Sequence, residues 1–157
     1  MKTLTRRIAH TCFGYIENDR LEYISRMYTI DEMVLDYFRD PSTWHDLKDI
    51  LIYHPDPIVR HEASFIVGEL EIEDLASFLS KVIKFDTSIV AKHEAAEALG
   101  KAKGREAMQA YIFLSKITSE QGYDDDVYHP DVQHTATQSM QRLRKEILMW
   151  GIRQGRK

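Results

Sequence analysis

Residues 58–68 read Ile-Val-Arg-His-Glu-Ala-Ser-Phe-Ile-Val-Gly, and residues 90–100 read Val-Ala-Lys-His-Glu-Ala-Ala-Glu-Ala-Leu-Gly. Both stretches carry a basic residue, then His-Glu-Ala, then four residues and a glycine, and the histidines are 93 − 61 = 32 residues apart. A period of that size fits a unit of two helices, and such units stack into an α-solenoid. The repeat therefore predicts an all-α fold, an α-solenoid of helical-hairpin repeats.

A third, degenerate copy follows the first two. Residues 129–134, His-Pro-Asp-Val-Gln-His, echo residues 54–61, His-Pro-Asp-Pro-Ile-Val-Arg-His. In this copy Thr135 replaces the glutamate of the motif and Gln141 replaces the glycine. We interpret it as a capping repeat at the end of the stack.

The rest of the chain also reads as helical. It has 7 glycines and 4 prolines, too few for the dense turns of an all-β chain, and its short loops predict antiparallel neighbours. We interpret Gly68 and Gly100 as plain helix stops and the tail 153–157 as frayed. The predicted helices lie near 4–16, 20–27, 30–39, 43–53, 57–70, 73–84, 88–102, 105–119 and 131–150.

Length and composition limit the classes of function. With 157 residues we expect a single domain: N-terminal helices in 1–40, the two His-Glu repeats in 41–104 and the degenerate cap in 105–157. The net charge of −4 argues against nucleic-acid binding, and no apolar run is long enough for a membrane span. With no secretion signal we expect a cytoplasmic protein. Cys12 is the single cysteine, so any metal must be held by histidine and carboxylate.

Helical phase predicts where the His-Glu pairs point. At 100° per residue, one face of the first helix points inward. His61 lies on the opposite face beside Ser64, Phe65 and Gly68, and Glu62 lies between His61 and the inward face. The second helix repeats this phase, so His93 projects from the same surface as His61. Neighbouring helices lie 8–10 Å apart, within reach of both side chains. The inward positions are Val59, Ala63, Ile66, Val67 and Leu70 in the first helix, and Ala91, Ala95, Ala98, Leu99 and Ala102 in the second.

Two histidines and a carboxylate with open positions are the ligands of many non-haem Fe(II) sites that handle oxygen. Catalytic zinc sites use a similar set, whereas Mg²⁺ and Ca²⁺ prefer oxygen ligands alone. The alternative is that both His-Glu pairs are ordinary polar surface residues of helical repeats.

The stretches 60–63 and 92–100 resemble the His-Glu motifs of deoxyhypusine hydroxylase, a HEAT-repeat enzyme with a non-haem diiron centre. The phrase His-Glu-Ala-Ala-Glu-Ala-Leu-Gly also occurs in HEAT-like repeats of the phycobilin-lyase type, which bind no metal. By resemblance to the hydroxylase, His61, His93 and Glu94 would be metal ligands, and Glu62 would be a ligand or a catalytic residue beside a substrate amine.

That family carries four His-Glu motifs, two in each half of a pseudo-symmetric chain, whereas this sequence has two intact motifs and resembles one half. A homodimer would supply the second half, so we expect two half-sites to meet and hold two Fe per dimer, with Zn as the alternative metal. Phe65 would help to bury that contact.

Three functions remain open at this point. The first is an oxygen-activating hydroxylase or monooxygenase acting on a small-molecule or amine substrate. The second is a non-enzymatic HEAT-repeat adaptor that binds a partner protein, and the third is a metal-binding scaffold or zinc hydrolase. The acidic stretch 121–128 is either a solvated turn or a lid for a cationic ligand.

Overall fold

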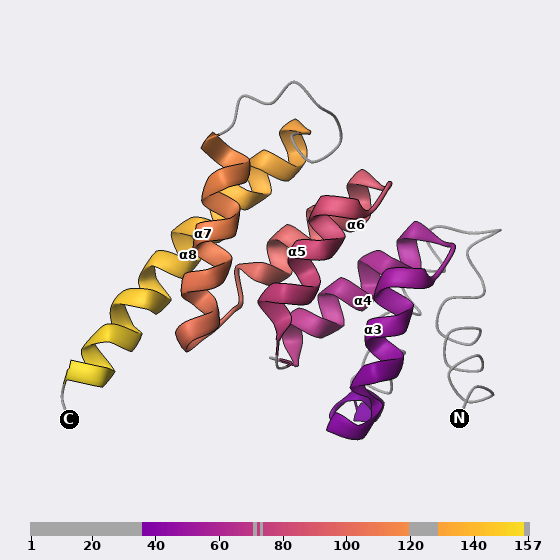
Figure 1. Ribbon diagram of the computed structural model, residues 1–157, viewed down its shortest axis with the longest axis horizontal. Helices are drawn as coiled ribbons and strands as arrows, with labels where there is room; N and C mark the ends of the chain where they lie inside the picture. Colours follow the sequence, from indigo (N-terminus) through magenta and orange to yellow (C-terminus); the bar gives the residue numbers. More distant parts are fainter. Residues whose placement is uncertain (1–35, 71, 73, 120–128, 156–157) are drawn as a thin grey trace.

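The computed structural model describes residues 36–70, 72, 74–119 and 129–155 (Figure 1). In this part of the chain every regular element is a helix, which confirms the all-α prediction. The helices predicted near 4–16 and 20–27 lie outside the described residues, as does most of 30–39, of which residues 36–38 are helical. The elements are a 3₁₀ turn η1 (Pro41–Thr43) and the α-helices α3 (Trp44–Tyr53), α4 (Pro57–Glu69), α5 (Leu75–Phe85), α6 (Ile89–Leu99), α7 (Gly104–Ser119) and α8 (Pro130–Gly155).

Local signals explain why the helix starts could be predicted. The Asp56 carboxylate accepts from the Ile58 amide at 2.9 Å, and Pro57 occupies the first helical position of α4, where its missing N–H is not needed. The Asp40 carboxylate caps η1 in the same way through the Ser42 amide. The last prediction was too short, because α8 continues through residues 151–155, which we expected to fray in part.

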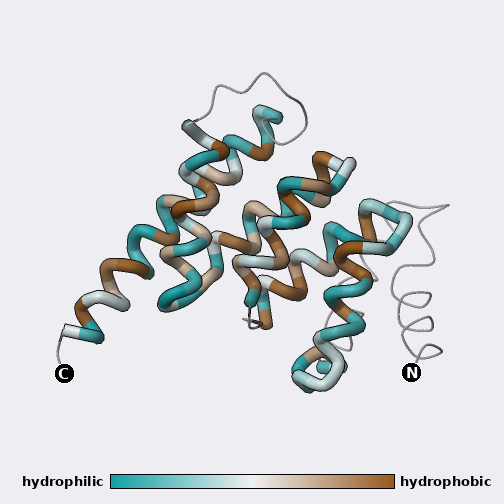
Figure 2. The backbone as a smooth tube through the Cα atoms, viewed as in Figure 1, coloured by the Kyte–Doolittle hydropathy of each residue, from teal (hydrophilic) through white to brown (hydrophobic). Residues whose placement is uncertain are grey.

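The helices form two layers (Figure 1). Helices α4, α6 and α8 lie side by side, and α3, α5 and α7 pair with them along the chain. The α7–α8 pair is antiparallel as expected: the start of α7 at Gly104 contacts Glu146 of α8, and its end at Thr118 contacts Met140. Hydrophobic and hydrophilic segments alternate along each helix (Figure 2), and the predicted inward positions are buried apart from Leu70, which is half-buried.

The inner helices approach each other closely at two glycines, and this corrects the prediction for Gly68. Gly68 lies inside α4, and a Cβ there would stand 2.9 Å from the Cβ of Ala98 in α6. Gly100, at the end of α6, would place a Cβ 2.7 Å from the Ser139 hydroxyl of α8. Gly68 is therefore not a helix stop, whereas Gly100 is the C-cap of α6, as predicted, and also allows α6 to approach α8 closely. Ser64, predicted on the outward side with Gly68, is likewise fully buried, because α6 covers that side of α4.

A buried ion pair joins α4 to the loop between α5 and α6. The Arg60 guanidinium donates to both Asp86 carboxylate oxygens, at 2.7 and 2.8 Å, and also to the carbonyls of His54 and Pro55. Both charged side chains are nearly inaccessible, with 10% and 6% exposed. Asp86 precedes α6 and also accepts from the Ser88 amide, so this pair ties the start of α4 to the start of α6.

The starts of α5 and α7 are each satisfied by a carboxylate from a later helix. Glu106 of α7 accepts from the amides of Asp74 and Ala76, at 2.8 and 3.3 Å, at the start of α5. Glu146 of α8 accepts from the Gly104 amide at the start of α7. Asp74 has a left-handed backbone (φ 61°) and makes no side-chain cap of its own, so Glu106 replaces that cap.

No helix in the described ranges has both the length and the apolar character that crossing a membrane requires.

We predict that Gly68→Ala lowers the free energy of unfolding by about 1 kcal/mol. The added methyl collides with the Ala98 backbone, 3.1 Å away, and the overpacking cost outweighs the gain in helix propensity. Gly151→Ala is the matched control in α8, because its Cβ would meet no atom within 4 Å. Urea denaturation should show that variant slightly stabilised; equal shifts in both variants would contradict the packing role.

We also predict that Arg60→Met destabilises the fold by about 3 kcal/mol, because the buried Asp86 carboxylate loses its counter-ion. Arg39→Met is the control: Arg39 pairs with Asp36, and both side chains are about two-thirds exposed, so little change is expected. Thermal denaturation monitored by circular dichroism compares the two. An Arg60→Met protein as stable as Arg39→Met would show that the pair contributes nothing.

Candidate metal centre

The His61 imidazole lies between two carboxylates. Its Nδ1 is 3.1 Å from Glu62 Oε1 on the same helix, and its Nε2 is 3.3 Å from Glu94 Oε2 on α6. The side chain of His61 is 28% exposed, whereas those of Glu62 and Glu94 are about one-tenth exposed. The carboxylates therefore lie deeper than the imidazole, in the seam between α4 and α6.

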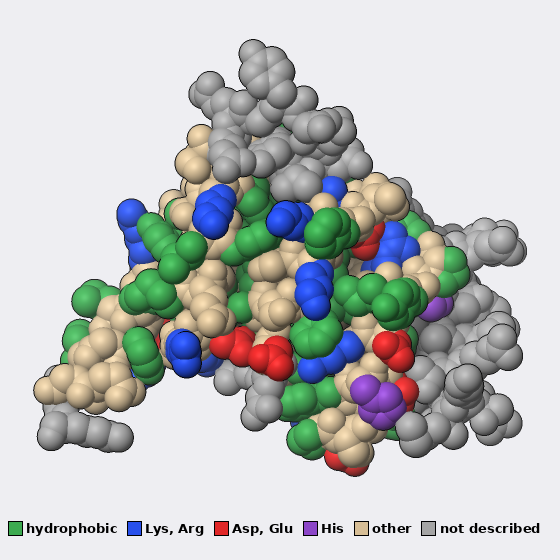
Figure 3. All heavy atoms as spheres, viewed as in Figure 1, with side chains coloured by type: hydrophobic (Ala, Val, Ile, Leu, Met, Phe, Trp, Pro, Cys, Tyr) green, Lys and Arg blue, Asp and Glu red, His purple; other side chains and the backbone are tan. Residues whose placement is uncertain are grey.

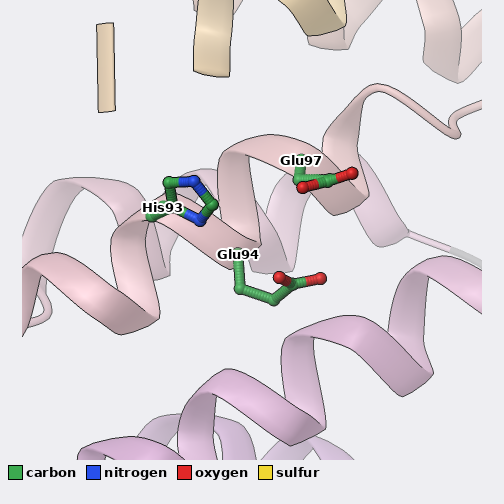
Figure 4. Close-up of side chains that lie close together, drawn as sticks. All are labelled: His93, Glu94 and Glu97. Atoms are coloured by element: carbon green, nitrogen blue, oxygen red, sulfur yellow. The ribbon is translucent and has the colours of Figure 1, made fainter. Parts of the chain in front are cut away.

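A second group overlaps the first at Glu94. His93, Glu94 and Glu97 each place one ligand atom within 4.8 Å of the others, which is close enough to hold a metal ion. Figure 4 shows Glu94 extending from α6 toward α4, with His93 and Glu97 on either side of it and higher in the view, on the same helix. His93 and Glu97 are four residues apart, the spacing that places two side chains on one helix face.

The structure thus brings together the four predicted residues and one more. His61, Glu62 and Glu94 are joined by direct contacts, and His93 joins them through its proximity to Glu94. Glu62 contacts His61 but is not part of the group around His93. Glu97 was not predicted as a ligand, although its i, i+4 spacing from His93 was a usable signal.

Electrostatics reflect the crowding of these carboxylates. Burial alone disfavours the charged imidazole, but the hydrogen bond with Glu62 and the charges of Glu94, Glu62 and Glu97 raise the pKa of His61. Burial raises the pKa of Glu94 as well. The charge of His61 lowers this pKa, whereas the charge of Glu97 raises it further. Without a bound cation, the cluster therefore favours holding a proton.

Two cations lie at the edge of this cluster, one in the turn after α6 and one on α8. Lys101 lies 4.7 Å from the centre of the Phe65 ring and pairs with Glu69 of α4. Arg142 of α8 approaches Glu97 at 3.4 Å. These partly exposed pairs offset some of the negative charge without entering the group formed by His93, Glu94 and Glu97.

The donor set consists of imidazole nitrogens and carboxylate oxygens. Such a set suits iron, zinc and similar divalent transition metals better than Mg²⁺ or Ca²⁺. The three atoms of His93, Glu94 and Glu97 leave further coordination positions for other ligands.

We predict that Glu62→Gln lowers the pKa of His61 in the metal-free protein, because the amide carries no charge to favour the imidazolium. In the wild type, a raised folded pKa stabilises the fold below the unfolded value of about 6.5. That contribution disappears as pH rises through the folded pKa. Wild type and variant should therefore differ most at mildly acidic pH.

NMR titration of the His61 ring with a chelator present measures this directly. Glu69→Gln is the control, since Glu69 pairs with Lys101 and not with His61. An unchanged His61 pKa in Glu62→Gln would contradict the contact.

Comparison of the chain with protein-family models, curated proteins and solved structures finds no match. The function proposed below therefore rests on the contacts of the residues just described.

Proposed function

We propose that this chain is a short HEAT-like solenoid that binds iron in the seam between α4 and α6 and acts as a non-haem iron hydroxylase or monooxygenase. The observation that carries the proposal is the group formed by His93, Glu94 and Glu97, whose ligand atoms lie within 4.8 Å of one another. His61 and Glu62 extend that group across the seam through Glu94.

Burial supports a binding role for these carboxylates. Glu62 and Glu94 are each only 7% exposed, and carboxylates are rarely buried unless they are paired. A divalent cation would offset the repulsion among Glu62, Glu94 and Glu97 more fully than a single proton on His61. Zinc is the alternative metal, since it accepts the same donors.

The residues of the chain would have distinct roles. His93, Glu94 and Glu97 would hold the metal, and bound iron would supply the chemistry that activates dioxygen. His61 and Glu62, 3.1 Å apart, can hold a proton between Nδ1 and Oε1 beside the metal group. This pair is suited to deliver or accept that proton during hydroxylation of a small-molecule or amine substrate.

Dimerisation belongs to the same proposal. Two-fold symmetry presents the same patch from each subunit, so two copies would bring two such groups together and hold two iron ions per dimer. His61 and Phe65 are both partly exposed beside the cluster, where a second copy could cover them.

A second candidate function is a protein-interaction adaptor, which a groove between α3 and α5 favours. Its cavity of about 300 Å³ is lined by Lys48 and Lys81, whose ammonium groups lie 4.2 and 5.4 Å from the Phe78 ring centre. Tyr53 and Phe85 stand exposed at its edge, by 78% and 74%. Figure 3 shows one face of the molecule, on which basic, acidic and hydrophobic side chains lie side by side. Asp49 and Asp86 also line the groove, and Asp86 is paired with Arg60, so the groove fits a partner segment that places an apolar residue in it and acidic residues at the two lysines.

We predict that the protein purified after iron supplementation contains about one iron per chain and is a dimer in solution. His93→Ala and Glu97→Gln should each lose at least about tenfold in metal affinity, since each removes a ligand. His45→Ala is the matched control, because His45 is exposed on α3 and pairs with Asp46.

Elemental analysis and mass measurement in solution check these outcomes. Failure to retain iron or zinc, with an unchanged melting temperature on metal addition, would overturn the metal proposal and leave the adaptor. Full metal content in His93→Ala would show that the ligand assignment is wrong.

A further inference from the structure

The three inner helices repeat one contact scheme, with a single exception. In each helix the motif histidine serves as the reference: His61 in α4, His93 in α6 and His134 in α8. The glycine seven residues after one histidine lies against the residue five positions after the next histidine. Gly68 faces Ala98 in this way, and Gly100 faces Ser139. The α6–α8 seam is therefore in the same register as the α4–α6 seam.

The exception lies at the residue after the histidine. In the α4–α6 seam, His61 contacts the glutamate at that position of the next helix, Glu94, at 3.3 Å. In the α6–α8 seam the corresponding residue is Thr135, whose side chain is shorter and uncharged. His93 consequently has no carboxylate from α8 at this position.

A cavity occupies the place of the missing carboxylate. It measures about 300 Å³, and its walls are Ile89, Val90, His93, Asp131, His134 and Thr135. His93 is thus shared between the cavity and the group that it forms with Glu94 and Glu97. Thr135 is only 3% exposed, and among the described residues its hydroxyl has no hydrogen-bond partner. Buried hydroxyls are normally paired, so this one is available to a ligand.

We infer that this cavity is the binding site for an exogenous small molecule that completes the coordination of the metal. This inference rests on the metal site of the proposed function. The walls define the ligand class: an oxygen donor for the metal, a short apolar body facing Ile89 and Val90, and a hydrogen-bonding group for Thr135 and Asp131. The α6–α8 seam admits this ligand because the α4–α6 seam is closed by the contact between His61 and Glu94.

The test uses the full chain loaded with Co²⁺, whose visible absorption changes when its ligands change, and acetohydroxamate as the probe. Acetohydroxamate has oxygen donors, one methyl group and an N–H, which match the cavity walls. In the wild type, titration should change the cobalt spectrum in a saturable way, with cobalt retained after gel filtration.

Two variants close the cavity by different means. Thr135→Glu restores the carboxylate of the repeat, and Val90→Phe fills the cavity from α6 without adding a ligand atom; Val90 is 45% exposed, so the larger ring is tolerated. Each should weaken acetohydroxamate binding at least about tenfold, or about 1.4 kcal/mol. Thr137→Glu is the matched control, since it adds the same side chain at an exposed position of α8 outside the cavity.

The outcomes separate the two proposals. A wild type that binds no cobalt overturns the metal site and, with it, this inference. A wild type that binds cobalt but shows no spectral response to acetohydroxamate, or equal affinity in Val90→Phe and wild type, overturns the cavity inference alone. Weakening in Thr137→Glu equal to that in Thr135→Glu would mean that charge on α8, and not the cavity, sets the affinity.

Discussion

The close contact of small residues between the inner helices determines the geometry of everything else. Because Gly68 has no side chain, α4 can approach Ala98 of α6, and Gly100 lets α6 approach Ser139 of α8 in the same way. This approach fixes the register of the seam as well as its width. His61 meets Glu94 at hydrogen-bonding distance only while that register holds. Packing and site chemistry are thus consequences of one steric constraint.

The carboxylates of the site repel one another, and this repulsion lowers the stability of the fold. Three carboxylates, those of Glu62, Glu94 and Glu97, share a small and partly buried volume, where like charges repel more strongly than in water. His61 relieves part of this repulsion when protonated, and Lys101 and Arg142 relieve a little more from the edge. A protein that needed only a stable seam could have used apolar residues there. The retained charge favours a role in binding a cation.

Much of the fold could be predicted, because its signals are local. Asp56 and Pro57 mark the start of α4 by their own chemistry, and the inward stripes follow from helical periodicity. The prediction failed where two helices meet. Ser64 and Gly68 lie opposite the stripe of a single helix, yet α6 buries them. Periodicity describes one buried face and cannot reveal a helix that is covered on two sides.

The candidate site, like the fold, could be predicted only in part. The repeated His-Glu phrase was sufficient to select His61, Glu62, His93 and Glu94, since equal phase puts them on one surface. Glu97 was missed although its spacing from His93 places both side chains on one helix face, because it lies outside the His-Glu phrase. Arg60 was read only as the basic residue of the motif, since its partner Asp86 lies 26 residues away in a loop.

The carboxylate caps from later helices have a consequence for how the chain folds. The start of α5 depends on Glu106 of α7, and the start of α7 depends on Glu146 of α8. Helices α5 and α7 therefore each leave amides unsatisfied until the next helix that supplies the carboxylate has docked. Such a dependence couples the stability of neighbouring pairs, so the described stack should lose its order as one cooperative unit, with the C-terminal pair supporting those before it.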